Sequence, residues 1–179
     1  MEIQVNDLNA YHYFDEQYGP LASLCSLPED QAIKIEHKGL TTESDRIRYL
    51  KERKICENIM FRSLVKKGGK PEINYALYFT IGEQRVVGDL YSTHMVIPVR
   101  DFDPKTISFT YTDSFHTYSR IDNHPTRRKL YTIEEINHVI SNYGFHSNLN
   151  GEGSLYKFIE MQVWSLQAMK NAMKKNKYI

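Results

Sequence analysis

The chain has 179 residues, 41% of them hydrophobic, and a formal net charge of +1. This length predicts one domain, because domains cluster at roughly 100–150 residues, and the near-neutral charge argues against a protein that mainly coats nucleic acid. The first residues are too polar for a signal peptide and no apolar run approaches the roughly 18 residues of a membrane span, so we expect a cytoplasmic protein without membrane contact.

The first third of the chain predicts one strand and one long helix. Residues 9–14 form an aromatic stretch that is typical of a short strand. Thr42 and Asp45 resemble an N-capping pair, and the apolar residues that follow at spacings of three, four and five predict a helix over 43–66. That apolar stripe consists of Ile47, Leu50, Ile55, Ile59, Met60 and Leu64. We interpret the basic residues of the helix as a solvated face, because acidic residues intersperse them. These residues are Arg46, Arg48, Lys51, Arg53 and Lys54.

The middle of the chain predicts a run of strands followed by a second helix. Strand candidates cover residues 74–81, 85–91, 94–99 and 106–112, and the last of them alternates apolar with polar side chains. Residues 113–130 are polar and irregular. A capping box, Thr132 with Glu135, and a well-placed Gly144 then delimit a helix over 132–143.

Residues 157–164 fit both a helical and an extended pattern, and their bulky β-forming side chains favour a strand to Trp164 with a helix after it. We therefore predict a single α+β domain with a central, largely antiparallel sheet, against which the two helices pack. The sheet is built from residues 9–14, 74–81, 94–99, 106–112 and 157–164.

The sequence contains no strong catalytic motif, neither a phosphate loop nor a nucleophile elbow. Two cysteines, Cys25 and Cys56, form no metal pair or redox motif, as expected of free thiols in a reducing compartment. Several loop residues could converge on a metal, but their spacing matches no zinc pattern, so we expect no metal site. They are His116, Asp122, His124 and His146.

The polar segment 111–129 is a candidate site for a phosphate-bearing ligand. Arg127 and Arg128 offer charge-assisted donors, and Tyr111, Ser114 and His116 add hydroxyl and imidazole donors. The alternative interpretation is a loop that is packed by tyrosine and salt-bridged at its surface.

A third group of residues is spread along the chain. His12 lies in the first aromatic strand, Tyr78 lies in a central strand, and Glu160 and Gln162 would share one face of the last strand. This combination resembles ADP-ribosyltransferase-like folds, which use an early His or Arg, a central Tyr or Ser, and a late Glu. The resemblance implies a cleft for a nicotinamide dinucleotide, with NAD as a substrate. It also implies that His12 holds the ribose, Tyr78 stacks on the nicotinamide, and Glu160 stabilises oxocarbenium-like charge.

The chain is also similar, over most of its length, to a group of uncharacterised bacterial proteins with no established activity, which supports a bacterial or phage-borne protein. The similarity lies in the stretches 11–14, 67–71, 102–104, 107–111 and 158–164. Our leading hypothesis is a nucleotide-handling domain, either an ADP-ribosyltransferase-like enzyme or an inert relative. The alternatives are a non-enzymatic protein that sequesters a nucleotide-type ligand, and a protein-interaction module without a small-molecule site.

Overall fold

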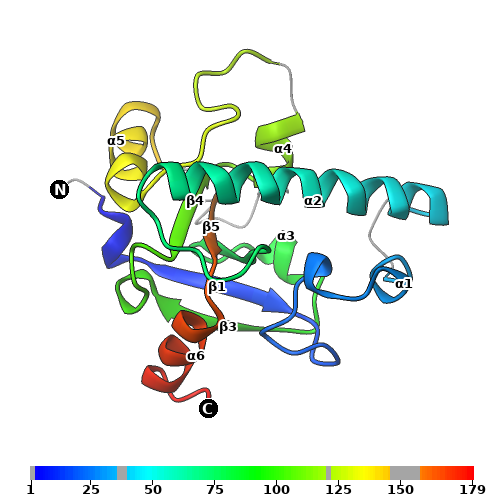
Figure 1. Ribbon diagram of the computed structural model, residues 1–179. Helices are drawn as coiled ribbons and strands as arrows, with labels where there is room; N and C mark the ends of the chain where they lie inside the picture. Colours follow the sequence, from blue (N-terminus) through cyan, green and yellow to red (C-terminus); the bar gives the residue numbers. More distant parts are fainter. Residues whose placement is uncertain (1–2, 36–39, 120–121, 146–157) are drawn as a thin grey trace.

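The computed structural model describes residues 3–35, 40–119, 122–145 and 158–179. Five strands form one antiparallel sheet in the order β3-β1-β2-β5-β4 (Figure 1). The strands are β1 (Asn9–Phe14), β2 (Leu77–Ile81), β3 (Thr93–Pro98), β4 (Ile107–Tyr111) and β5 (Ile159–Val163). The predicted α+β fold with a central antiparallel sheet is confirmed, including the strand within 157–164.

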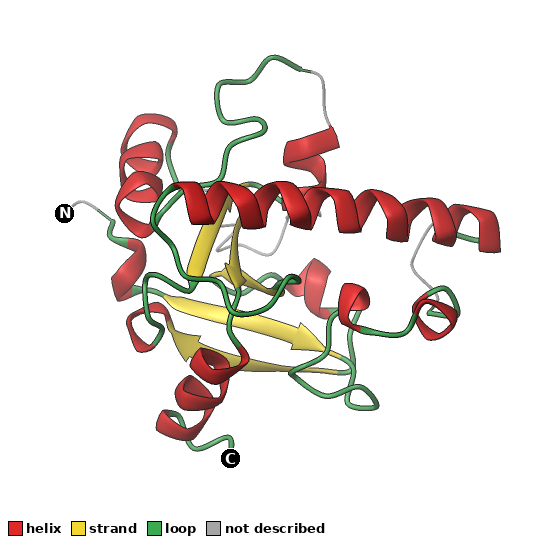
Figure 2. Ribbon diagram, in the orientation of Figure 1, coloured by secondary structure: helices red, strands yellow, loops and turns green. Residues whose placement is uncertain are grey.

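Helices surround this sheet, and Figure 2 shows how much of the chain they occupy. They are α1 (Glu29–Ala32), α2 (Glu43–Lys66), α3 (Arg85–Gly88), α4 (Ser114–Ser119), α5 (Ile133–Tyr143) and α6 (Leu166–Lys175). The long α2 passes over one side of the sheet and α6 lies on the other side (Figure 1). None of the helices in the described ranges is both long and apolar enough to cross a membrane.

The predicted caps account for the helix boundaries. The Thr42 hydroxyl accepts from the Asp45 N–H (3.1 Å) at the start of α2. Thr132 and Glu135 form the reciprocal capping box of α5, and Gly144 ends that helix with φ 86°, a left-handed value that favours glycine. Each cap supplies partners for backbone groups that a helix end leaves unpaired.

The expected strand over residues 85–91 is wrong, because residues 85–88 form the single helical turn α3. The backbone groups of this segment pair locally, since the Gly88 and Asp89 N–H groups donate to the Gln84 and Arg85 carbonyls (both 2.8 Å). It folds instead as a turn whose Gln84 N–H donates to the Tyr13 hydroxyl (2.8 Å).

The expected apolar stripe of α2 is only partly correct. Ile55 and Ile59 are 61% and 44% exposed, whereas Leu50, Met60 and Leu64 are buried. Arg53 and Glu57 complete the buried stripe, at 8% and 2% exposure. The interpretation of Arg53 as part of a solvated face is therefore wrong, because α2 turns this guanidinium toward the sheet.

Alternation along the strands gives the sheet two different faces. Phe79, Phe109 and Met161 belong to an apolar core that also contains side chains of α5 and α6. The intervening residues are polar and face the α2 side. Among them, Glu160 of β5 lies opposite Thr110 of β4, and Tyr78 lies on β2, the other neighbour of β5. This polar face under α2 is where the candidate site lies.

Candidate active site

A chain of buried hydrogen bonds runs across the polar face and ends at Glu160. The Trp164 indole N–H donates to the Ser108 hydroxyl (2.8 Å), and that hydroxyl donates to the Gln162 Oε1 (2.8 Å). The Gln162 amide then donates to the Thr110 hydroxyl and to the Glu160 Oε1, both at 3.1 Å. Gln162 is fully buried, so its side chain orients Glu160.

Glu160 is a buried carboxyl with an altered acidity. The residue is only 4% exposed, and its Oε2 accepts a hydrogen bond from the Ser114 N–H (3.3 Å). Burial, reinforced by the neighbouring Asp113 carboxylate, raises the pKa of Glu160 to about 8. Burial would also raise the pKa of Asp113, but hydrogen bonds from His116 and the charge of Arg53 outweigh it and hold that pKa below its ordinary value. The two carboxyls therefore carry one negative charge between them at neutral pH.

Arg53 supplies the positive charge of the site. Its guanidinium carbon lies 4.2 Å from the centre of the Tyr78 ring, a cation–π contact, and its Nη1 donates to the Ser114 hydroxyl (3.2 Å). Burial opposes its charge, but the electrostatic influence of Tyr78, Tyr49, Glu160 and Asp113 outweighs burial and raises the pKa of Arg53. The Tyr78 hydroxyl donates to the Glu57 Oε1 (2.6 Å), and burial raises the pKa of Glu57.

These groups open onto a pocket of about 420 Å³. Its aromatic walls include Tyr49, Tyr78, Tyr91, Phe115 and Phe158, and its polar groups include Arg53, Asp113, His116 and Glu160. A smaller pocket of about 170 Å³ adjoins it and shares Tyr49, Arg53 and Tyr78 among its walls. A largely apolar concavity with a few converging polar groups is the ordinary form of a small-molecule site.

Backbone strain lies directly beside the carboxyl pair. Thr112 has φ 113°, which is unfavourable for a β-branched residue. Its hydroxyl lies 2.9 Å from that of Thr117 and accepts from Arg127 Nη1 (3.2 Å), and these contacts hold the residue in place. The strained residue directs the chain from β4 so that Asp113 and the Ser114 N–H point at the site, and strain of this kind clusters at functional sites.

The structure brings Tyr78 and Glu160 to one pocket and places His12 at the adjoining one. The His12 ring stacks on Phe79 at 4.6 Å, so it lies against the apolar face. Its Nδ1 lies 2.7 Å from the Tyr78 carbonyl oxygen and its Nε2 lies 2.9 Å from the Pro20 carbonyl oxygen. Burial lowers the pKa of His12, although both carbonyls favour the protonated ring. In this position the His12 side chain connects β1 to β2 and to the loop that follows β1.

The residues proposed for a phosphate site do not come together. Tyr111 donates to the carbonyls of Tyr143 and Gly144 (2.9 and 2.7 Å). Arg127 donates from Nε to the Asp122 Oδ1 and from Nη2 to its Oδ2, a two-pronged ion pair, whereas Arg128 lines a separate surface hollow. Ser114 and His116 belong instead to the pocket region, where Ser114 binds Arg53 and His116 binds Asp113 (3.2 Å). Residues 113–130 are also less irregular than expected, because 114–119 form α4.

Sequence reasoning missed Arg53, Glu57 and Asp113. The available signal was the spacing of three, four, three and four that joins Leu50, Arg53, Glu57, Met60 and Leu64. Such a spacing defines one face of a helix whatever the side chains are. For metals, no group of three or more His, Cys, Asp or Glu side chains converges within the described residues. His146, one of the residues considered for such a site, lies outside them.

Comparison of the chain with protein-family models, with curated proteins and with solved structures finds no match. The features that bear on function are therefore the geometry of the pocket and its polar groups.

Proposed function

We propose that the protein is a nucleotide-handling enzyme that cleaves the N-glycosidic bond of a nicotinamide dinucleotide, in the manner of ADP-ribosyltransferase-like enzymes. The observation that carries the proposal is the carboxyl pair at an aromatic-walled pocket, formed by the buried Glu160 and the half-buried Asp113. Perturbed carboxyls in a concavity are typical of catalytic sites. The pocket volume of about 420 Å³ lies in the range of small-molecule sites.

The chemistry requires negative charge where positive charge develops. The bond between the ribose C1′ and the nicotinamide nitrogen breaks, and its electron pair leaves with the nicotinamide and neutralises the pyridinium ring. The sugar then carries oxocarbenium-like charge, which the ionised Asp113 stabilises while Glu160 is protonated. An attacking hydroxyl or water releases one proton, and Asp113 is the group that accepts it.

The remaining groups fit supporting roles in this proposal. The Tyr78 ring is held between Arg53 and the Glu57 hydrogen bond, so it offers a fixed aromatic surface for the nicotinamide. Gln162 and the Ser114 N–H fix both oxygens of Glu160. His12 acts as a positioning residue, because its ring nitrogens are within hydrogen-bond distance of the Tyr78 and Pro20 carbonyls.

A second candidate function is non-enzymatic binding of a nucleotide-type ligand. It is favoured by the extent to which the polar groups satisfy one another, since the Tyr78 hydroxyl binds Glu57 and both Glu160 oxygens accept hydrogen bonds. Under this alternative the aromatic walls provide stacking and the carboxyl pair is a structural element.

The decisive experiment measures nicotinamide release from NAD by chromatography, alongside NAD binding by calorimetry. We expect release by the wild type, and at least a hundredfold loss in Asp113→Asn with binding largely kept, because the charge matters most in the transition state. Glu52→Gln is the control, since Glu52 is exposed on α2 beside Arg53. Binding without release in any form would support the second candidate, and neither binding nor release would refute the enzymatic proposal.

A further inference from the structure

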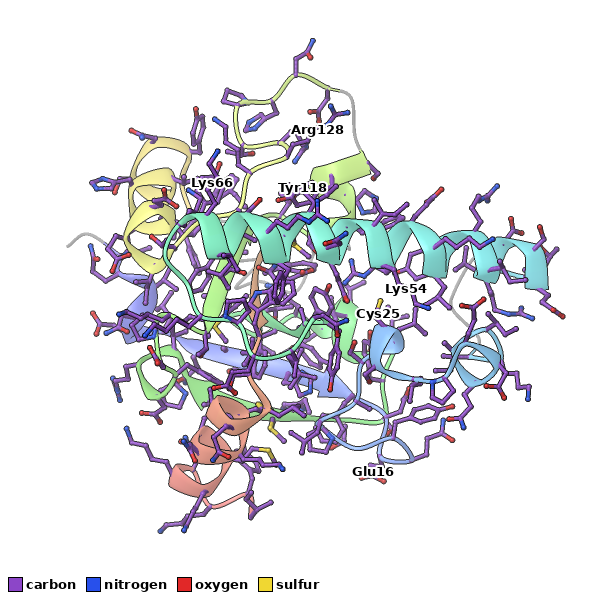
Figure 3. All side chains as sticks on the ribbon, in the orientation of Figure 1. Glu16, Cys25, Lys54, Lys66, Tyr118 and Arg128 are labelled. Carbon is purple, nitrogen blue, oxygen red and sulfur yellow. The ribbon has the colours of Figure 1, made fainter. Side chains whose placement is uncertain are left out.

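A second concavity lies away from the pocket, at the C-terminal end of α2. This surface hollow of about 640 Å³ is lined by side chains of α2, of the loop before α5 and of α5 itself. Its charged residues are Lys66, Lys67, Arg128, Lys129 and Glu135. Figure 3 labels Lys66 on α2 and Arg128 on the loop above it. At 1.5 Å per residue, Lys66 lies about 20 Å along α2 from Arg53, so the hollow is distinct from the carboxyl pair.

The hollow concentrates positive charge in a protein that is nearly neutral. Four cations and one carboxylate give it a formal charge of +3, whereas the whole chain carries 23 basic and 22 acidic residues. The rest of the chain therefore carries 19 basic against 21 acidic residues, a formal charge of −2. The net charge of the chain thus conceals a strongly asymmetric distribution, and the local field of the hollow favours anions.

Most of these cations have no partner within the part of the chain that the structure describes. Lys67 pairs with Glu135 (2.6 Å), but Lys66, Arg128 and Lys129 form no ion pair with any described residue. All three are exposed.

Helix electrostatics explains only part of this cluster. Lys66 and Lys67 complement the negative C-terminal end of α2, which accounts for them without a ligand. Arg128 and Lys129 come from a separate segment, in which Arg128 has a left-handed φ of 57° and its N–H binds the Thr117 carbonyl (3.1 Å). That turn brings two further cations toward the helix end, against their mutual repulsion. An anion bound between the two segments would offset the repulsion.

We propose that this basic hollow binds the phosphodiester backbone of a nucleic-acid strand. The hollow is wide and open, which suits an extended polyanion rather than a single enclosed phosphate. Its concave shape does not suit a membrane surface, which requires apolar side chains that project into the lipid. Tyr131 is the Phe, Trp or Tyr residue among those that line the hollow, and it is buried, so the exposed His138 is the ring left to contact a base. Binding should therefore depend on phosphates and be independent of sequence.

The test measures fluorescence anisotropy of a labelled single strand of about 12 nucleotides over about 50 to 200 mM salt. The site variant is Lys66→Ala with Arg128→Ala. The matched control is Lys170→Ala with Lys174→Ala, which removes the same charge from exposed positions on α6. We expect the site variant to bind at least about tenfold more weakly and to reduce the slope of log K against log salt by about 1.4, because each phosphate contact contributes about 0.7 for a single strand. The control should lose less than about twofold.

A single substitution, Lys129→Ala, provides a second test with a smaller expected loss of about threefold. Equal losses in the site and control variants would overturn the proposal, because the whole-protein charge would then explain binding. It would also be overturned if the wild type bound no oligonucleotide at the lowest salt, or if it bound anionic lipid vesicles and not the oligonucleotide. The measurement requires no nicotinamide dinucleotide, so its failure leaves the proposed enzymatic function intact.

Discussion

Replacing Glu160 with glutamine should change how the stability of the protein depends on pH. In the folded state the pKa of Glu160 is about 8, whereas in the unfolded chain it has its ordinary value of 4.5. The folded protein therefore keeps this proton at pH values at which the unfolded chain has released it. The stability that this proton contributes is complete below about pH 4.5 and is lost as the pH rises to about 8. Complete loss corresponds to about 5 kcal/mol, at about 1.4 kcal/mol per pH unit.

The glutamine variant resembles the protonated acid and cannot ionise, so it avoids this loss. We therefore expect the free energy of unfolding of Glu160→Gln, minus that of the wild type, to rise with pH between about 5 and 8, by at most about 1.4 kcal/mol per unit. Other groups titrate as well: Glu57 shifts in the same direction as Glu160, and His12 in the opposite sense. Subtracting the wild-type curve removes these contributions, because the variant retains both groups.

Urea unfolding at a series of pH values, followed by the fluorescence of Trp164, measures this difference. Trp164 is the single tryptophan of the chain and is fully buried, so its emission reports global unfolding. The exposed Glu52→Gln provides a control whose difference curve should be flat. A Glu160→Gln difference that is independent of pH within about 0.5 kcal/mol would refute the altered acidity of Glu160 and the single shared charge of the carboxyl pair.

Two further predictions concern the groups around Glu160. Arg53→Met should lower the free energy of unfolding by about 3–5 kcal/mol, because it leaves buried carboxyls without their cation. The control Lys54→Ala, on the exposed side of α2, should change this free energy by less than about 0.5 kcal/mol. Equal effects of the two substitutions in a urea titration would contradict the buried role of Arg53. Tyr78→Phe removes the hydroxyl that binds the Glu57 carboxyl at 2.6 Å and should cost about 1.5–3 kcal/mol, with the pKa of Glu57 rising further in a carbon-detected NMR titration. An unchanged Glu57 titration would argue against that hydrogen bond.

The features that local sequence rules control were predictable. The alternation of residues 106–112 predicted β4, and the capping box at Thr132 predicted the start of α5, because both depend on neighbours in the chain. The strand within 157–164 and its shared Glu160–Gln162 face also followed from alternation. The site residues on that strand were therefore placed correctly with respect to each other.

The other half of the site was not predictable by the same rules. Arg53 and Glu57 occupy positions of the buried face of α2, and a search for apolar residues at those positions passes over them. Their burial is tolerated only because Tyr78, Asp113 and Glu160 come from strands and loops that are distant in sequence. Thr112 is a similar case, since β-branched residues disfavour a positive φ and only tertiary contacts stabilise it.

The order of the strands has a consequence for the time at which the pocket forms. β5 lies between β2 and β4, and neither of those strands pairs with the other, so the sheet is continuous only after β5 is inserted. Glu160 is on that inserted strand. During synthesis the ribosome must therefore complete residues 159–163 before the carboxyl pair can assemble, although α2, β1 and β2 have emerged long before. Pairing between such distant segments is intrinsically slow, so the nascent chain should pass through a period in which the polar face under α2 is open and the carboxyl pair is not assembled.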